Sequence, residues 1–139
     1  MYPKVWGKCI WNSINYITMD YPENPTDEDK QHYYQFFQSL QYVLPCARCR
    51  FNLQQNLQKY PLTLEALTNR DTLLKWVIDL HNIVNYHTGK KVLPYYQALQ
   101  KINRSMQPDN RRYYYLVIFL VVIIILILVY FIYRKIKKN

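Results

Sequence analysis

The sequence predicts an all-α fold: a four-helix bundle with a short fifth helix, followed by one C-terminal transmembrane helix. The chain of 139 residues has only two glycines, so it is short of the residue that tight β-hairpins prefer. Apolar residues recur every three or four positions in four successive segments, which is the period of amphipathic helices packed in a bundle. An uncharged stretch at residues 113–133 predicts the transmembrane helix.

The first two helices are predicted on either side of a proline-rich break. Residues 5–20 show helical spacing of apolar side chains, and Pro22 and Pro25 then end the pattern. Thr26 can cap a second helix, because three acidic residues follow it at the positive end of the helix dipole. This helix is expected to run to Pro45. The apolar positions of the first pattern are Val5, Cys9, Ile10, Ile14, Ile17 and Met19, and those of the second are Tyr33, Phe36, Phe37, Leu40 and Val43.

Three further helices are predicted before the membrane segment. The third begins at Cys46 and ends before Pro61. Asn69 can cap the fourth, and Gly89 is its expected C-terminal stop. A short fifth helix is expected from Pro94 to about Ile102. The apolar positions of the third are Phe51, Leu53, Leu57 and Tyr60, and those on the buried side of the fourth are Leu73, Leu74, Trp76, Val77, Leu80, Ile83 and Val84.

The end of the chain is expected to anchor the protein in a membrane. As a helix, residues 113–133 would span about 31 Å, which matches a hydrocarbon core of about 30 Å. Aromatic residues lie near both ends of this span, as in an aromatic belt. A buried core helix is the alternative, but the centre of the span has no polar face. The predicted division is a domain at 1–102, a linker at 103–112, the transmembrane helix at 113–133 and a basic tail at 134–139.

The net charge of +9 is concentrated around the predicted membrane span. Residues 1–110 hold 12 basic and 9 acidic side chains, a net charge of +3, and the last 29 residues add six basic side chains and no acid. We therefore expect no nucleic-acid binding. Basic residues flank both ends of the span, so the positive-inside rule gives no orientation. The N-terminus lacks the apolar region of a secretory signal, which favours a domain in the cytosol or inside a particle assembled there.

A Cys-x-x-Cys motif is the first candidate for chemistry. Cys46 and Cys49 lie at the predicted start of a helix, where the dipole favours a thiolate, and Arg48 and Arg50 add positive charge. A redox dithiol needs these conditions. A zinc site would require further ligands, and the sequence has no second such motif, so no metal is expected. A thioredoxin-like motif would require a βαβ context, whereas the surroundings are helical on both sides.

A polar cluster on the fourth helix is the second candidate. His81 and Asn85 are four positions apart and Asn82 lies between them, so their side chains lie close together on an otherwise apolar helix. Asparagine is a poor helix former. The cluster suits hydrogen bonding to a heterocycle or a ribose. An exposed helix end with ordinary polar residues is an equally good interpretation of the spacing alone.

Together these motifs resemble the Erv/ALR family of FAD-linked sulfhydryl oxidases. The resemblance covers about residues 5–102 and is greatest to the short forms of large cytoplasmic DNA viruses. It rests on Pro45 to Cys49, on His81 to Asn85 with Gly89-Lys90 after it, and on Gly7 to Trp11, which is similar to the family's Gly-Arg-x-x-Trp.

The resemblance implies a helical bundle that binds FAD without a Rossmann fold and oxidises protein dithiols, with O₂ as acceptor and hydrogen peroxide as product. It implies that Cys46 receives electrons from the substrate and that Cys49 lies against the isoalloxazine. The cofactor-binding residues that it implies are Gly7, Lys8, Trp11, Asn15, His81, Asn82, Asn85 and Lys90.

The sequence departs from the family pattern in three respects. Many family members have an additional structural disulfide, and this sequence has no cysteines left to form one. Asn15 stands where the family usually has histidine, which predicts altered flavin contacts. A second cysteine pair, the family's usual shuttle, is missing, so the partner is expected to be a separate dithiol protein such as a thioredoxin-like carrier. Cys9 is expected to be a buried or semi-buried free thiol, with an intermolecular crosslink as the alternative.

The resemblance also predicts a homodimer, with apolar surface supplied by Tyr33, Tyr34, Phe36 and Phe37. The alternative to an oxidase is a non-enzymatic, membrane-anchored helical interaction module or virion structural protein.

Overall fold

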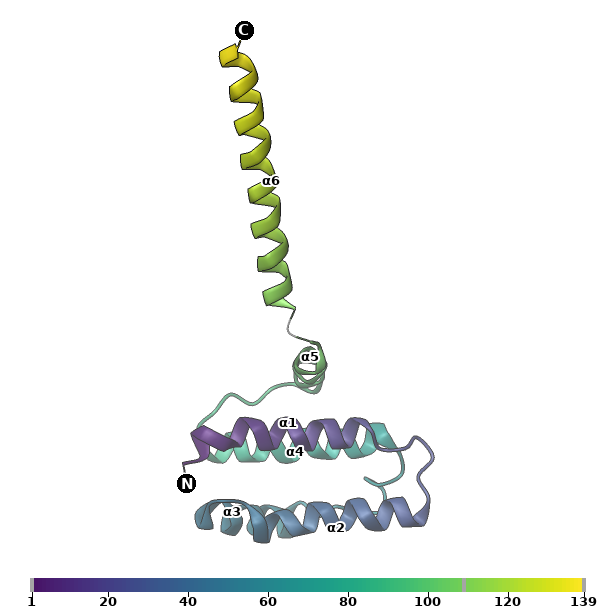
Figure 1. Cartoon of the computed structure of the whole chain (residues 1–139). Helices are drawn as coiled ribbons and strands as arrows, with labels where there is room; N and C mark the ends of the chain where they lie inside the picture. Colours follow the sequence, from purple (N-terminus) through teal and green to yellow (C-terminus); the bar gives the residue numbers. More distant parts are fainter. Residues whose placement is uncertain (1, 109, 139) are drawn as a thin grey trace. The chain divides into compact units, whose positions relative to one another are not determined.

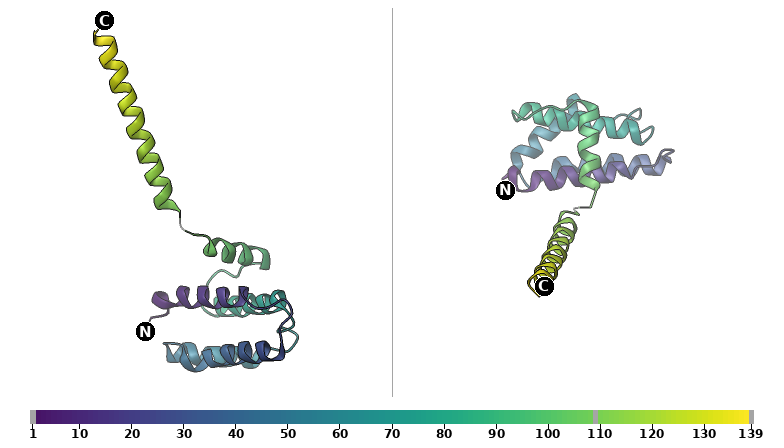
Figure 2. Two further views of the ribbon diagram at one scale, coloured as in Figure 1. Left: turned by 45° about the vertical axis from the view of Figure 1, so that its right-hand side comes forward. Right: turned by 90° about the horizontal axis from the view of Figure 1, so that it is seen from above.

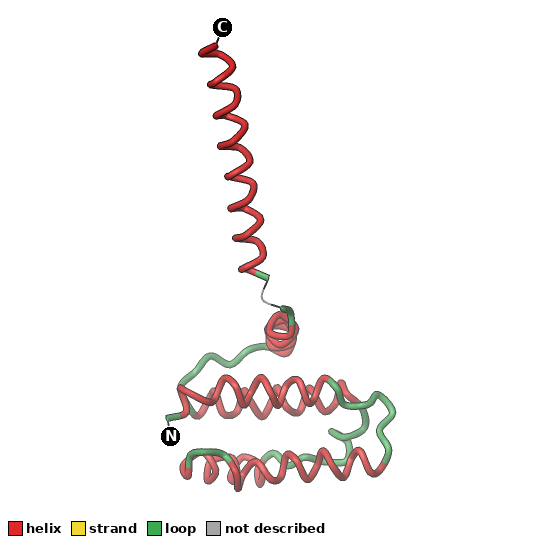
Figure 3. Tube along the Cα trace, in the orientation of Figure 1, coloured by secondary structure: helices red, strands yellow, loops and turns green. Residues whose placement is uncertain are grey.

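The computed structural model describes residues 2–108 and 110–138, which form six α-helices and no strand (Figure 3). The chain divides into two compact units, one that extends to Met106 and one that begins at Gln107. The predicted all-α class and the order of the helices are confirmed. The helices are α1 (Pro3–Met19), α2 (Asp27–Val43), α3 (Ala47–Lys59), α4 (Arg70–His87), α5 (Tyr95–Met106) and α6 (Arg111–Lys138).

The first unit is a bundle of two helix pairs. Helix α1 packs beside α4, and α2 packs beside α3 (Figure 1). Contacts between α3 and α4 join the two pairs, and α5 crosses α1 and α4 on their outer side (Figure 2). Side chains from α1 to α4 and from the loop before α4 form the core, and a smaller cluster fixes α5. The core side chains are Ile14, Tyr21, Phe37, Leu40, Leu53, Leu57, Leu62, Leu67, Leu73, Trp76, Val77 and Leu80, and the smaller cluster is Leu74, Ile78 and Ile102.

The predicted helix boundaries follow from local hydrogen bonds. Thr26 accepts from the backbone N–H of Asp29 while the Asp29 carboxylate accepts from the backbone N–H of Thr26, which is a capping box. Asn69 and Thr72 form the same arrangement at the start of α4. Gly89 has a φ of 67° just after α4, a conformation that favours glycine. These three signals were predicted correctly.

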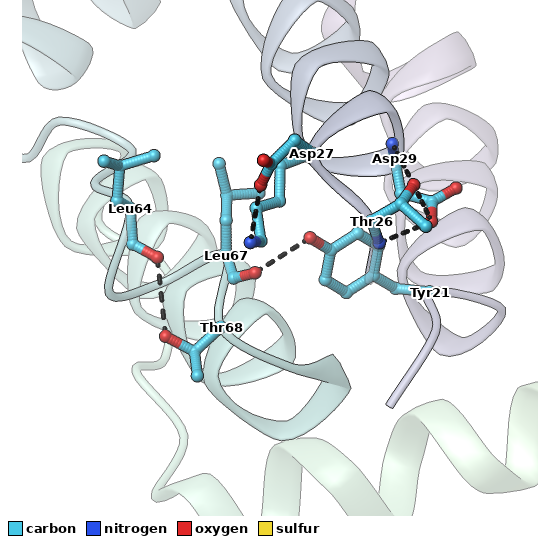
Figure 4. A network of polar contacts seen from close by, with 8 residues as sticks. Tyr21, Thr26, Asp27, Asp29, Leu64, Leu67 and Thr68 are labelled. Carbon is cyan, nitrogen blue, oxygen red and sulfur yellow. Dashed lines mark hydrogen bonds and ion pairs between the residues drawn. The ribbon is translucent and has the colours of Figure 1, made fainter. Parts of the chain in front are cut away.

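A buried tyrosine joins two loops of the bundle. The hydroxyl of Tyr21, which follows α1, donates to the carbonyl of Leu67 at 2.9 Å (Figure 4). Arg70 donates from Nε to the carbonyl of Tyr21 at 2.8 Å and pairs with Glu23 at 2.9 Å. The loop between α1 and α2 is thereby held against the loop that leads into α4.

We expect Tyr21→Phe to lower the free energy of unfolding by about 1 to 2 kcal/mol, because the buried Leu67 carbonyl loses its donor. Urea denaturation of the full chain in detergent measures this loss. Tyr34→Phe is the control, since Tyr34 is exposed and no side-chain hydrogen bond of its own is found within the described residues. An equal loss in both variants would contradict the assignment.

Some expectations about burial and boundaries are wrong. Helix α5 continues to Met106 and α6 already begins at Arg111, so helix replaces both ends of the predicted linker at 103–112. Cys9 is exposed rather than buried, because α1 turns Ile14, Asn15 and Thr18 toward the bundle and Cys9 away from it. Val5, Ile17, Val43 and Phe51 belong to the apolar patterns but are also exposed.

The four aromatic residues of α2 that the dimer prediction named are not equally exposed. Phe37 lies in the core, and Tyr33 and Phe36 are half-buried against it. Tyr34 is the exposed member of the set. Three of the four rings therefore pack within the bundle itself.

Helix α6 belongs to the second unit. It is long enough and apolar enough to cross a membrane, by length and composition. Its tyrosines and aliphatic side chains are exposed throughout the part whose side chains are described.

Candidate functional site

Three segments meet at one end of the bundle. The N-terminal part of α1, the C-terminal part of α4 and the turn between α2 and α3 all lie at this end, and the loop joined by Tyr21 lies at the other (Figures 1 and 2). The two candidate motifs of the sequence, the cysteine pair and the polar cluster of α4, therefore lie at the same end of the fold.

A disulfide joins Cys46 and Cys49 at the start of α3, with 5.1 Å between their Cα atoms. Cys46 is the N-cap of this helix, and its Sγ accepts a hydrogen bond from the backbone N–H of Cys49 at 3.2 Å. Both cysteines are half-buried. In the reduced state, the positive end of the α3 dipole and the hydrogen bond to Sγ would favour a thiolate at Cys46.

Arg50 fixes the turn that carries this disulfide. The carbonyl of Leu44 accepts from Arg50 Nη1 at 2.6 Å and from the Cys46 N–H at 2.8 Å. The backbone N–H of Arg50 in turn donates to the Cys46 carbonyl at 3.0 Å. The sequence indicated Arg50 only as a nearby charge. In the structure its guanidinium also ties the end of α2 to the first turn of α3.

Trp11 and His81 form a parallel aromatic stack between α1 and α4. Their ring centroids are 3.9 Å apart and their planes differ by 4°. Burial, together with the nearby positive charges of Lys101 and Lys90, lowers the pKa of His81 to about 4. His81 is therefore neutral at pH 7. The two rings form a flat, uncharged surface, and two lysines lie close enough to affect the pKa of His81.

Three polar side chains of the bundle form no hydrogen bond within the part of the chain that the structure describes, and the polar atom of one of them, Trp6, is fully buried. Asn15 on α1 is 6% exposed and Asn56 on α3 is 4% exposed. Neither side-chain amide takes part in a hydrogen bond within residues 2–108 and 110–138. The indole Nε1 of Trp6 is also buried without a partner in that part of the chain. Because a buried polar atom is usually hydrogen-bonded, the Trp6 Nε1 atom favours a polar ligand beside the N-terminal part of α1.

The remaining predicted residues have different surroundings. The Asn82 amide holds the loop before α5, since its Nδ2 donates to the Leu93 carbonyl at 2.8 Å and its Oδ1 accepts from the Leu93 N–H at 3.0 Å. The Asn85 carbonyl accepts from the Lys90 N–H at 2.8 Å. The structure thus gives Asn82 a role within the chain that the spacing did not predict. Gly7 is half-buried, and Lys8, like Lys90, is exposed.

Sequence reasoning did not single out four residues: Trp6, Arg50 as a hydrogen-bond donor, Asn56 and Lys101. A polar residue inside the apolar pattern of α3 was the available signal for Asn56. The sequence held no signal for Lys101, because its proximity to His81 depends on how α5 crosses α4.

The described residues contain no group of three or more His, Cys, Asp or Glu side chains that could hold a metal ion.

We expect Asn82→Ala to lower the free energy of unfolding by about 2 kcal/mol, because both backbone groups of Leu93 lose their partner. Hydrogen exchange of residues 90–106 in the flavin-free chain should also become faster. Asn85→Ala is a matched control on the same helix, since its side-chain amide makes no hydrogen bond within the described residues. Equal exchange in the two variants would show that the Asn82–Leu93 pair does not hold the loop.

The comparisons with known proteins agree with one another. The model of the Erv1 / Alr family matches residues 8–105. A protein of Acanthamoeba polyphaga mimivirus named "Probable FAD-linked sulfhydryl oxidase" is 49% identical over 111 residues, which is 80% of this chain and 78% of the relative. The FAD-linked sulfhydryl oxidase of African swine fever virus is 29% identical over 90 residues, 65% of this chain and 73% of the relative.

A solved structure has the same fold. The crystal structure of the yeast Erv1 core superposes with a TM-score of 0.63 at 22% identity, over 68% of this chain and 78% of that chain.

Proposed function

The chain belongs to the Erv1/Alr family, and from this premise we propose that it is an FAD-linked sulfhydryl oxidase that forms disulfide bonds in protein substrates. Its relatives carry this activity in their names. The observation that carries the proposal is the disulfide between Cys46 and Cys49 at the N-terminus of α3. In the same bundle, α1 and α4 contribute the Trp11–His81 stack.

The residues of the bundle suit FAD. The Trp11–His81 stack offers a neutral aromatic surface for a planar heterocycle. The unpartnered groups of Asn15, Asn56 and Trp6 offer hydrogen bonds to ring edges or hydroxyls. Lys90 and Lys101 supply positive charge for a diphosphate, and Gly7, Lys8, Asn82 and Asn85 complete the proposed binding set. When bound, FAD supplies a two-electron acceptor for the cysteine pair and a route to O₂, which is reduced to hydrogen peroxide.

The reaction at the disulfide is thiol–disulfide exchange. A substrate thiolate attacks the Sγ of Cys46, so that a mixed disulfide forms and Cys49 leaves as a thiolate. The second substrate thiolate attacks the substrate sulfur of this mixed disulfide and releases Cys46. The substrate has then lost two electrons and two protons as its disulfide forms, and the protein has gained a reduced cysteine pair.

The surroundings of Cys46 support its role as the cysteine that receives the substrate. A thiol with a low pKa leaves faster in exchange. The N-terminus of α3 and the Cys49 N–H stabilise negative charge on the Cys46 sulfur. Release of the oxidised substrate in the second exchange is therefore favoured, and Cys49 is left to face the cofactor.

The substrate is proposed to be a separate dithiol protein, such as a thioredoxin-like carrier, with O₂ as acceptor. The third cysteine of the sequence, Cys9, stands alone on α1. Oxygen consumption with a reduced thioredoxin-like protein and with dithiothreitol tests this proposal. Oxidation of dithiothreitol without oxidation of any protein dithiol would contradict the carrier.

Helix α6 is proposed to anchor the domain in a membrane, with the bundle in the cytosol or inside a virus particle. The length and composition of α6 support this, and viral relatives support the particle. The full chain should float with lipid vesicles in a density gradient. Ile124→Lys, in the centre of the span, should lower the floating fraction severalfold, whereas equal flotation would contradict the anchor.

Cofactor content tests the proposed activity directly. The purified full chain in detergent should be yellow, contain one FAD per chain, and produce one hydrogen peroxide per dithiothreitol oxidised. A correctly folded, colourless chain that cannot take up FAD would instead favour the interaction module or virion structural protein. The proposed homodimer is tested in the same preparation by light scattering.

A further inference from the structure

Large apolar side chains are exposed on both sides of the redox disulfide. Tyr42 is 70% exposed and Val43 is 67% exposed at the end of α2, and Phe51 is 61% exposed on α3. Each lies within four positions of a disulfide cysteine. The helical period of their segments would allow Val43 and Phe51 to face inward, but Leu40 and Leu53 occupy the core instead.

The same region is positively charged. Residues 31–64 contain no aspartate or glutamate but include Arg48, Arg50 and Lys59. Arg50 is held by the Leu44 carbonyl. Arg48, between the two cysteines, is exposed and forms no ion pair within the part of the chain that the structure describes. Its charge is therefore available to a partner at the point where exchange takes place.

We propose that Tyr42, Val43, Phe51 and Arg48 form the docking surface of the oxidase, and that it selects a protein dithiol flanked by an aromatic side chain and by acidic residues. The proposal rests on the proposed function, because the surface surrounds the disulfide that the substrate must attack. The occupant is an extended segment of the substrate protein.

The chemistry of the surface favours this occupant over others. Burial of these exposed aromatic and aliphatic side chains under an apolar side chain of the partner stabilises the complex. A positive field without nearby carboxylates attracts an acidic segment and repels a basic one. Contacts on both sides of the disulfide also hold the substrate sulfur in position for attack on Cys46. Dithiothreitol attacks Cys46 without such contacts.

Three reduced dithiol peptides test the docking surface with the holoenzyme in detergent. All three contain the same cysteine pair and differ in the flanking residues. The first peptide has phenylalanine and glutamates, the second has phenylalanine and lysines, and the third has serine and glutamates. We expect kcat/KM for the first peptide to exceed those of the other two by about tenfold. The preference for glutamate over lysine should fall as the salt concentration rises.

Variants of the protein separate docking from exchange. The double variant Tyr42→Ser, Phe51→Ser should lower kcat/KM for the phenylalanine–glutamate peptide by about tenfold, while turnover of dithiothreitol stays within about twofold. Tyr96→Ser is the matched control, since Tyr96 is 72% exposed but lies on α5. The Tyr96 variant should leave both kcat/KM for the peptide and turnover of dithiothreitol unchanged.

The outcomes are distinguishable. Equal rates for the three peptides, or an equal fall for peptide and dithiothreitol in the double variant, would overturn the docking surface and leave the oxidase proposal standing. A wild-type chain with bound FAD that oxidises neither dithiothreitol nor any peptide would instead overturn the proposed function.

Discussion

Replacing Cys49 by serine is expected to lower dithiol oxidation by at least about a thousandfold while FAD remains bound. The variant cannot form the disulfide of α3, and a serine hydroxyl can neither leave as a thiolate nor pass electrons to the cofactor. The stack of Trp11 and His81 lies on other helices and is left intact. Flavin absorbance and oxygen consumption of the same preparation measure the two effects.

The variant should also trap the substrate. Cys46 keeps its thiol and can form a mixed disulfide with an oxidised form of the partner, and the motif at the start of α3 then has no second thiol to resolve it. Non-reducing gels should show this adduct with Cys49→Ser but not with Cys46→Ser. Cys9→Ser is the control and should retain the full rate, because Cys9 lies on α1 outside the disulfide. Turnover by Cys49→Ser close to the wild-type rate would contradict the assigned role.

The fold was predictable because its signals are local. Thr26, Asn69 and Gly89 end or begin helices through hydrogen bonds and dihedral angles within a few residues, which a sequence displays directly. The apolar period identified the helices for the same reason. The apolar period does not show which apolar side chains are buried, because burial depends on the neighbouring helix. Val43 and Phe51 fit the apolar period but are exposed.

The candidate site was predictable only where its residues share a motif. The Cys-x-x-Cys motif and the polar cluster of α4 are visible as spacings, and the aromatic stack joins one of these motifs to α1. Asn56 and Lys101 belong to other helices, so their place in the site depends on tertiary packing. The spacing identified Asn82 as a candidate, but it did not indicate that the Asn82 amide also joins α4 to the loop before α5 through Leu93.

The stability of the flavin-free chain should fall by about 2 kcal/mol between pH 7 and pH 5 because of His81 alone. The pKa of His81 is about 4 in the folded chain, mainly because of burial, against an ordinary value of 6.5. As the pH falls below about 6.5, the unfolded chain binds a proton on this histidine and the folded chain does not, so the free energy of unfolding decreases. The decrease ends near pH 4, where the folded chain also binds the proton.

His81→Phe isolates this effect. Phenylalanine keeps a flat ring against Trp11 but has no proton to bind, so the difference in unfolding free energy between the variant and the wild type should change with pH by the same 2 kcal/mol. Carboxylates such as Asp29, whose pKa the Thr26 hydrogen bonds lower, titrate equally in both chains and cancel. A difference that stays constant from pH 7 to pH 5 would show that His81 is protonated normally in the folded chain. The stack would then be cationic near pH 6, and it could no longer serve as the neutral surface on which the proposed FAD site depends.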